Sequence, residues 1–432
     1  MRTLKYLVCI AVLLCPLLAL RAQDSIFARG VIRDLTSAEF HGRGAAYRGD
    51  SIAATYLATK LQSFGTKPLA EGFLQHYAFD ICILDGRVEL TVGGRKMTQG
   101  TEFSPAGTTK PCKGRFPVLY FDAEKLSDDA AVALFLMQNA KNIAKSFVYI
   151  DVSHDKDLNK TSRRKLNLIK RGTDVFGSAG VLLGVDAMPP MSIPANAKPM
   201  DFSLLFVKSS LMSDKPKKIK VRVDNRFAAH PTQNVVAYVE GTRCKDSLVV
   251  FMGHYDHVGQ VGKVVYPGAH DNASGAAAVL DLARHFAARP ADYTTVFLFF
   301  SGEESGLMGS IYFVQNPLFD LSKVKFMVNI DLFCGGDEGI MVFNAEADNT
   351  KAFFAKLKAV NAEHGYVADV EPRKISANSD HYPFAAKGLP AVFVLTKGGD
   401  YGGYHSPDDT CDGCQIRHYN DILHLILQTL GL

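Results

Sequence analysis

Acidic and imidazole side chains recur directly after apolar runs between residues 249 and 331. Three segments begin with an apolar run and continue with these side chains: VVFMGHYDHVG, FLFFSGEESG and FMVNID. A fourth segment, PGAHDNASG, lies between the first two. Each apolar run predicts a buried strand, and ligands of open α/β sheets bind outside the carboxyl ends of the strands. Imidazole and carboxylate groups bind zinc and similar divalent ions. The sequence therefore predicts a metal site at one edge of a sheet.

His254 and Asp256 follow the first of these runs. In an extended chain, residues two apart point to the same side, so the two side chains share a face. A metal-bound histidine usually donates its other N–H to a carboxylate. Either both residues bind metal, or Asp256 orients His254. Taken alone, such a pair is more common on a protein surface than in a metal site.

Two adjacent acids, Glu303 and Glu304, follow the second run. Like charges this close disfavour joint ionisation unless a cation compensates them. A metal ion resolves the conflict if one glutamate binds it and the other acts as a base. The alternative is a pair of acids at a helix N-terminus, where the helix dipole favours them.

Single candidates complete the set. Asp271 precedes a predicted helix, where an N-cap is the alternative role, and Asp331 ends the third run. His405 lies much later, in a glycine-rich loop with the sequence GGYHSPDDT. His257 and His270 stand beside candidate ligands and are not assigned as ligands. Together these residues suit two divalent ions, and two ions about 3.5–4 Å apart can share one hydroxide and polarise a carbonyl.

The motifs HYDHVG, GAHDNASG, FSGEESG, NID and YHSPDDT, in this order, resemble those of the clan MH dizinc exopeptidases. That family contains secreted leucyl-type aminopeptidases, glutamate carboxypeptidase and secretory glutaminyl cyclases. The resemblance covers about residues 230–430. It implies an α/β fold with a mixed, mostly parallel sheet flanked by helices.

The resemblance also implies roles for individual residues. His254 and Asp331 would bind one zinc ion, Glu304 and His405 the other, and Asp271 would bridge them. Glu303 would be the general base and Asp256 the partner that orients His254. Weaker candidates for the substrate pocket are Asp380, in the SDH segment, and Tyr404. The family usually has an acidic residue where this chain has His270.

The implied function is that of a secreted aminopeptidase that hydrolyses peptides through a hydroxide bridging two zinc ions, with manganese or cobalt as possible substitutes. A glutaminyl cyclase uses one zinc ion and has tryptophans around its pocket, whereas this chain has no tryptophan and has Tyr404 before His405. A carboxypeptidase or dipeptidase with the same metal site is an alternative function. A binding protein without activity should have lost ligands, and none is replaced here.

The first 23 residues have the pattern of a secretory signal peptide, with a basic start followed by an apolar run. Its removal lowers the formal net charge from +4 to +1, because Arg2, Lys5 and Arg21 are its charged residues. A nearly neutral mature chain gives no indication of a nucleic-acid partner. We expect an exported protein, periplasmic or extracellular, with peptide substrates and no membrane association once the signal is removed.

The remaining chain divides into three parts. Residues 24–80 are expected to be a helical lead-in, residues 81–225 a strand-rich insertion loosely similar to a protease-associated domain, and residues 226–432 the catalytic domain. In the last part, apolar runs predict strands at 235–239, 248–252, 296–300, 326–330, 340–343 and 391–395. Amphipathic patterns predict helices at 274–288, 307–314, 351–364 and 416–430.

Two further patterns lie outside the motifs. Cys411 and Cys414 could form half of a structural zinc site, a redox pair or a disulfide, or could be free thiols. We favour a disulfide that fixes the loop beyond His405, with free thiols as the alternative. Basic clusters at 160–165 and 215–220 are expected to be solvated loops.

Overall fold

The computed structural model describes residues 24–399 and 403–432. The predicted signal peptide, residues 1–23, lies outside the described residues. Among the helices of the described residues, none is both long enough and apolar enough to cross a membrane.

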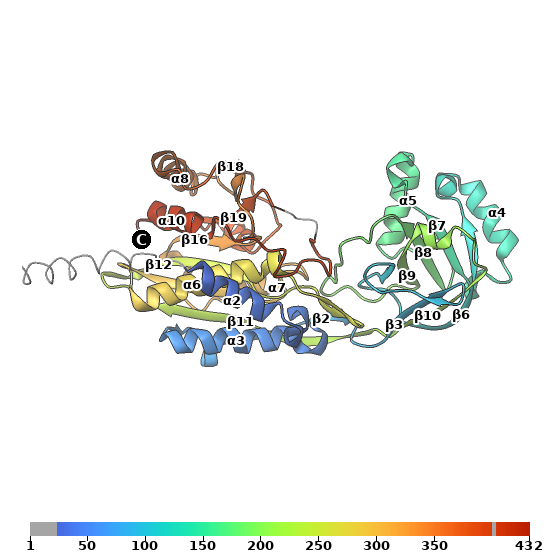
Figure 1. Ribbon diagram of the computed structural model, residues 1–432, viewed down its shortest axis with the longest axis horizontal. Coiled ribbons are helices and arrows are strands. Elements are labelled where there is room, and N and C mark those ends of the chain that lie inside the picture. Colours follow the sequence, from blue (N-terminus) through green and yellow to red (C-terminus); the bar gives the residue numbers. More distant parts are fainter. Residues whose placement is uncertain (1–23, 400–402) are drawn as a thin grey trace, which may run out of the picture.

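A mixed sheet forms the centre of the main region, which comprises residues 24–80 and 226–432 (Figure 1). Its strands are arranged in the order β1-β11-β15-β12-β16-β19-β17-β18, and β2 pairs with β11. Strands β15, β12, β16 and β19 are mutually parallel, and the outer pairs β11–β15 and β17–β19 are antiparallel. The strands are β1 (Lys67–Pro68), β2 (Leu74–Ile83), β11 (Arg226–Val239), β12 (Cys244–His254), β15 (Tyr293–Phe300), β16 (Val324–Ile330), β17 (Gly339–Phe343), β18 (Val370–Arg373) and β19 (Ala391–Lys397).

Both faces of this sheet are covered, which explains why its parallel strands are apolar along most of their length. Successive side chains of a strand point to opposite faces. Thus Phe251 packs in the core beneath α2, α3, α6, α8 and α10, whereas Met252 packs with α7 and α9 on the other face. The helices are α2 (Ser25–Leu35), α3 (Gly49–Phe64), α6 (Ser274–Ala288), α7 (Met308–Gln315), α8 (Lys351–His364), α9 (His381–Ala386) and α10 (Tyr419–Leu430).

The register of the parallel strands aligns their carboxyl ends. His254, the last residue of β12, pairs with Phe300, the last residue of β15. Met252 pairs with Asn329 of β16, so the end of β16 is level with His254. The polar residues that follow these strands therefore meet at one edge of the sheet. The predicted fold class, a mixed sheet flanked by helices, is confirmed.

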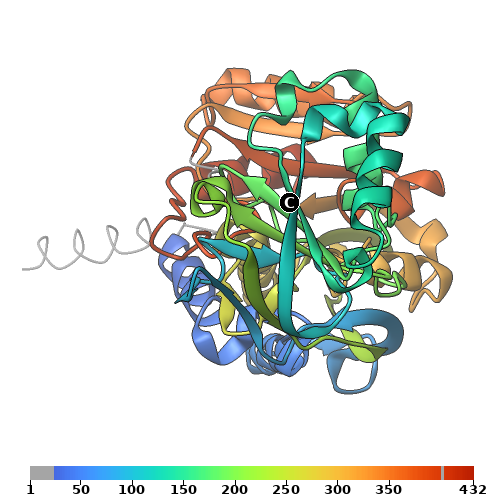
Figure 2. The same ribbon diagram turned by 90° about the vertical axis from the view of Figure 1, so that its right-hand side faces the viewer.

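The insertion (residues 81–225) forms a second sheet in the order β4-β3-β10-β6-β7-β8-β9-β5. It extends from the long antiparallel pair β2–β11 (Figure 1), and Figure 2 shows it in front of the main sheet. Two helices, α4 and α5, accompany its strands. The elements are β3 (Val88–Val92), β4 (Arg95–Lys96), β5 (Phe103–Pro105), β6 (Cys112–Phe121), α4 (Asp129–Asn139), β7 (Phe147–Asp151), α5 (Lys160–Lys170), β8 (Gly180–Val185), β9 (Ser203–Lys208) and β10 (Lys218–Val223).

Two expectations for these regions were wrong. The lead-in 24–80 is not helical throughout, because β1 and most of β2 lie in it and pair with β11. The basic clusters lie mostly in regular structure: residues 160–165 begin α5 and 218–220 begin β10, and only 215–217 lie in a loop. In α5 the buried side chains Leu166 and Ile169 pack in the insertion core, while most of the basic side chains face outward.

The expected disulfide between Cys411 and Cys414 is also wrong. Cys414 is buried and pairs with Cys334, and Cys411 is a free thiol. The chain just after β16 approaches this loop, since the amide of Gly335 donates to the carbonyl of Gln415 at 2.5 Å. The disulfide therefore joins the segment after Asp331 to the segment after His405.

Candidate metal centre

Five structural elements deliver the candidate ligands to one place at the edge of the main sheet. His254 ends β12, the two glutamates follow β15, and Asp331 follows β16. Asp271 lies in the helical turn Ala269–Ala273 that leads into α6, and His405 lies in the loop after β19. Three overlapping groups of side chains lie close enough to hold a cation: His254, Asp271 and Asp331; His257, Asp271, Glu304 and His405; and His254, Glu303 and Glu304.

The first group is centred on Nε2 of His254. This atom lies 3.2 Å from Oδ1 of Asp331 and 3.3 Å from Oδ1 of Asp271. On the other side of the ring, Nδ1 lies 3.2 Å from the carbonyl of Asp256 and 3.7 Å from its Oδ1. The Asp331 carboxylate is held in turn by the hydroxyl of Ser379 at 2.7 Å.

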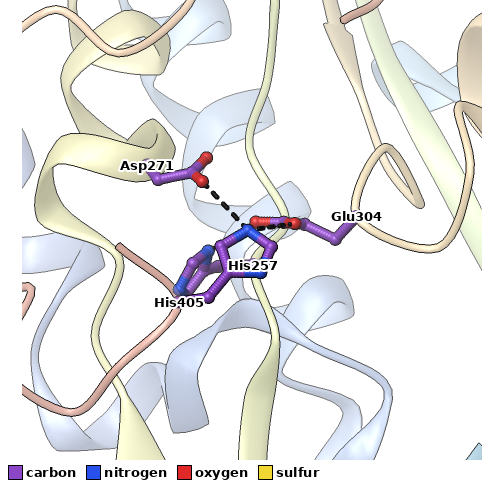
Figure 3. A group of neighbouring side chains, drawn as sticks. All are labelled: His257, Asp271, Glu304 and His405. Atoms are coloured by element: carbon purple, nitrogen blue, oxygen red, sulfur yellow. Dashed lines mark hydrogen bonds and ion pairs between the residues drawn. The ribbon is translucent and has the colours of Figure 1, made fainter. Parts of the chain in front are cut away.

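The second group is centred on Nε2 of His405 (Figure 3). This atom lies 2.8 Å from Oε2 of Glu304 and 3.1 Å from Oδ2 of Asp271. The other oxygen of Glu304 lies 2.6 Å from Nδ1 of His257. Asp271 thus directs one oxygen to each group, which is the arrangement expected of a bridging ligand.

The electrostatics of the ligand residues favour proton or metal binding at the two imidazoles. Burial opposes charge on His405, but Glu304 and Asp271 raise its pKa to about 11. Burial likewise opposes charge on His254, yet Asp331 and Glu303 raise its pKa well above the usual value. A divalent cation would replace these protons and would satisfy the same carboxylates.

Glu303 differs from Glu304 in its surroundings. Burial, reinforced by the charges of Glu304 and Asp380, raises the pKa of Glu303 well above that of an ordinary glutamate. Burial would also raise the pKa of Glu304, but His405 and His257 hold it at about 2. The two adjacent acids therefore have separate properties: one takes up a proton readily and the other stays ionised.

The donor set fits a pair of divalent cations. Five carboxylates are buried or nearly buried within a few ångströms of three imidazoles. Burying charges of one sign is costly unless cations pair with them. Imidazole nitrogens and carboxylate oxygens in these numbers match the ligands of zinc.

His257 was not expected to take part in the site. Its ring is fully buried, contacts Glu304 and packs edge-on against His405, with ring centroids 5.3 Å apart. The sequence signal was present, because His257 stands three residues after His254 in the same motif. Its neighbour His270 is buried too, and its Nδ1 accepts the amide of Cys334.

Arg43 was not identified from the sequence either. Its guanidinium is fully buried and donates to the carbonyls of Tyr255 and Gly268 at 2.7 Å each, and to three more carbonyls, one of them that of Asp271. A side chain at Gly42 would clash with the carbonyl of Tyr266, since a Cβ would lie 2.4 Å from it. Arg43 thus joins the loop after β12 to the turn that carries Asp271.

Asp409 holds the same turn from the opposite side. Its carboxylate accepts the amides of His270 at 2.8 Å and Asp271 at 3.1 Å. The residue belongs to the YHSPDDT motif, which was used only for His405. The turn that carries Asp271 and the loop that carries His405 are therefore joined directly beside these two candidate ligands.

The two weaker candidates lie at different depths. Asp380 is fully buried and neither oxygen has a hydrogen-bond partner among the described residues; burial raises its pKa to about 7. Tyr404 is 45% exposed and stacks on the ring of His405, with centroids 4.0 Å apart. Tyr404 is therefore accessible from solvent, whereas Asp380 is not, and its charge acts on the pKa of Glu303.

Comparison with known proteins identifies this region. Residues 234–430 match the model of Peptidase family M28. The chain is similar to a probable leucine aminopeptidase of Trichophyton verrucosum, with 29% identity over 208 residues that cover 46% of this chain and 55% of the relative. It is also similar to aminopeptidase YwaD of Bacillus subtilis, with 22% identity over 285 residues that cover 60% of each chain. The chain spans little more than half the length of these curated relatives. The resemblance to dizinc exopeptidases is confirmed.

A solved structure extends the likeness to the whole fold. The zinc aminopeptidase BSAP of Bacillus subtilis superimposes with a TM-score of 0.66 at 18% sequence identity, covering 93% of this chain and 94% of that one. The likeness therefore includes the insertion as well as the main sheet.

Proposed function

We propose that this protein is an exported aminopeptidase that uses two zinc ions to release N-terminal residues from peptides. The observation that carries the proposal is the cluster of buried carboxylates and imidazoles at the sheet edge, with Asp271 between two groups of ligands. The cluster lies within the part of the chain that matches Peptidase family M28. The names of the similar proteins support removal of residues from the N-terminal end of the peptide.

The ligands divide between two positions. His254 and Asp331 would hold one zinc ion, Glu304 and His405 the other, and Asp271 both. Bound zinc ions act as Lewis acids that polarise the peptide carbonyl and lower the pKa of water.

Glu303 would move the protons of the reaction. Its carboxylate accepts a proton from the attacking water and then donates it to the leaving amine. The raised pKa of the buried Glu303 side chain suits this role, because it makes the carboxylate a stronger proton acceptor than an ordinary glutamate. Asp256 keeps His254 in position, and its Oδ1 also accepts the amide of Glu303 at 3.2 Å.

The remaining candidates would shape the substrate side of the site. Tyr404 lies exposed beside His405, where it can contact the first side chain of the peptide. Asp380 would act on Glu303 through its negative charge. Export is supported by the basic and apolar start of the chain and by the disulfide between Cys334 and Cys414, since disulfides persist in oxidising compartments.

The test is an assay of the purified protein on aminoacyl reporters, N-blocked peptides, dipeptides and a peptide with N-terminal glutamine, together with a metal count. We expect two zinc ions per chain, chelator-sensitive release of free N-terminal residues and no cleavage of blocked peptides. Cleavage restricted to C-terminal residues or dipeptides would overturn the choice of substrate. One zinc ion with formation of pyroglutamate would indicate a glutaminyl cyclase instead.

A further inference from the structure

One loop of the insertion reaches the candidate metal centre. Residues 189–197, here called the proline segment, run PPMSIPANA between β8 and β9. Met191 is buried in the core of the insertion, so the segment is anchored there. The segment nevertheless forms hydrogen bonds with two loops of the main region that carry candidate ligands.

The first contact is with His405. Nδ1 of its ring donates to the carbonyl of Met191 at 2.7 Å, across 214 positions of the sequence. In return, the amide of Met191 donates to the carbonyl of His405 at 3.0 Å. The backbone of Met191 therefore holds both the ring and the main chain of this ligand.

The second contact is with the loop that carries Glu304. The hydroxyl of Ser305 donates to the carbonyl of Ile193 at 3.1 Å. The amide of Ala195 donates to the carbonyl of Ser305 at 2.9 Å. The proline segment thus bonds twice to each of two loops.

Both loops supply the same zinc position under the proposed function. A metal-bound imidazole needs a partner on its second nitrogen, which fixes the tautomer and the orientation of the ring. For His405 this partner is the Met191 carbonyl, and the bond leaves Nε2 free to face Glu304 and Asp271. His405 also has a left-handed backbone with φ of 50°, which a residue other than glycine adopts only where its surroundings hold it there.

We propose that the proline segment of the insertion is a positioning element of the metal centre, which sets the zinc affinity of the Glu304–His405 position and leaves the His254–Asp331 position largely unaffected. This inference rests on the two-zinc assignment of the proposed function. It gives the insertion a specific role: a displacement of the insertion relative to the main sheet would weaken one zinc position selectively.

The experiment is a chelator competition that resolves the two zinc affinities of the full chain. Met191→Pro removes the amide that donates to the His405 carbonyl and keeps the Met191 carbonyl that accepts Nδ1 of the ring. We expect it to weaken the binding of one zinc ion about tenfold, at the lower end of the 10–100-fold range for losing a partner of a metal ligand outright. Met191→Leu, which keeps both backbone groups, should leave both affinities within about threefold of wild type.

A second pair of variants tests the other contact and guards against misfolding. Ala195→Pro removes the amide that donates to Ser305, and Ala195→Ser keeps it. Ala195→Pro should weaken the binding of the same zinc ion that His405→Ala weakens. Equal loss at both positions, or unchanged affinities in folded Met191→Pro and Ala195→Pro, would overturn the inference.

Hydrogen exchange on the metal-free wild-type protein gives a readout that does not depend on activity. The amides of Met191 and Ala195 should exchange at least about 100-fold more slowly than unprotected amides. Fast exchange at both would also overturn the inference. A wild-type protein that binds two zinc ions but cleaves no peptide contradicts the proposed function and leaves this inference standing.

Discussion

Two sheets of this protein place acidic residues at the carboxyl ends of parallel strands, and the two edges differ in almost every other respect. In the insertion, Asp122, Asp151 and Asp186 follow or end β6, β7 and β8. They border a cavity of about 930 Å³. By position in the fold alone, this edge resembles the candidate metal centre.

The hydrogen bonds separate the two edges. Asp151 is exposed and accepts bonds from the amide and hydroxyl of Ser153 and from the hydroxyl of Tyr149. Asp186 is exposed and accepts the hydroxyl of Ser209. Solvent and local donors therefore satisfy these acids. At the main sheet, the carboxylates are buried and face imidazoles and one another, so that only protons or cations can compensate them.

The largest expected effect comes from substituting one aspartate at each edge. Asp271→Asn removes the carboxylate shared by both ligand groups, and we expect loss of at least one zinc ion and a fall in kcat/KM of about 10³-fold or more. Asp151→Asn should leave zinc content and kcat/KM unchanged. Metal analysis and steady-state kinetics check both variants. Equal effects of the two substitutions would contradict the distinction between the edges.

A second prediction separates metal binding from proton transfer within the main edge. Glu303→Gln keeps the size of the side chain and removes the proton acceptor, so kcat should fall about 10²–10⁴-fold. Zinc content should stay at the wild-type value, in contrast to Asp271→Asn. A Glu303→Gln enzyme with most of its activity would show that another group is the base.

A third prediction uses pH. Without a cation, the pKa of His405 is about 11, and that of His254 is also raised, so both rings carry a proton at pH 7. Zinc requires the unprotonated nitrogen, and binding should therefore release protons and tighten as pH rises. With one proton released at each position, the affinity for each zinc ion should rise about tenfold per pH unit around neutrality. Zinc titration calorimetry in buffers of different ionisation enthalpy measures the number of protons released. Zinc binding without proton release would refute the prediction.

A fourth prediction compares the cations that support each region. Arg43→Met removes the donor shared by five backbone carbonyls, and we expect the free energy of unfolding to fall by about 3 kcal/mol or more. Lys165 of α5 instead pairs with Asp129, which is 92% exposed, and Lys165→Met should cost less than about 1 kcal/mol. Denaturant unfolding of the metal-free variants measures both, and similar losses would contradict the prediction.

The smallest expected effect concerns Asp380. Its folded-state pKa of about 7 exceeds the ordinary value of 3.8, so the folded protein binds this proton more tightly than the unfolded chain does. Stability is therefore lost as pH rises from about 4 to 7. Asp380→Asn should remove this loss and stabilise the metal-free protein at pH 8 by about 1–2 kcal/mol, with little effect at pH 4. Unfolding curves of wild type and Asp380→Asn at the two pH values measure the change in the free energy of unfolding and its sign.

The main sheet was predictable because each of its central strands is a continuous apolar run in the sequence. Helix α8 was expected at 351–364 and has these bounds, with Gly365 at its end. In the insertion, α4 is apolar on most sides and has no single apolar face. Helix α5 does bury one face, with Leu166 and Ile169, but it lies in a stretch rich in basic residues that was interpreted as a loop. Both helices depend on packing against β-strands that the sequence does not identify as their partners.

For the candidate site, the sequence predicted residues but not the contacts that hold them. His254, Asp271, Glu304 and Asp331 follow apolar runs or begin a helix, and these local signals bring them to one edge. The roles of Arg43 and of the Met191 backbone depend on contacts across more than 200 positions. The disulfide partner of Cys414 was missed for the same reason, because Cys334 is 80 positions away in the sequence. Such contacts leave no local pattern.

The distribution of the ligands along the chain has a consequence for the cell that makes this protein. Arg43 is synthesised early, Met191 follows, and His405 is the last of the candidate ligands to be made. A nascent chain therefore cannot complete the proposed Glu304–His405 position before His405 has been added. That position can form only after the whole insertion has been synthesised.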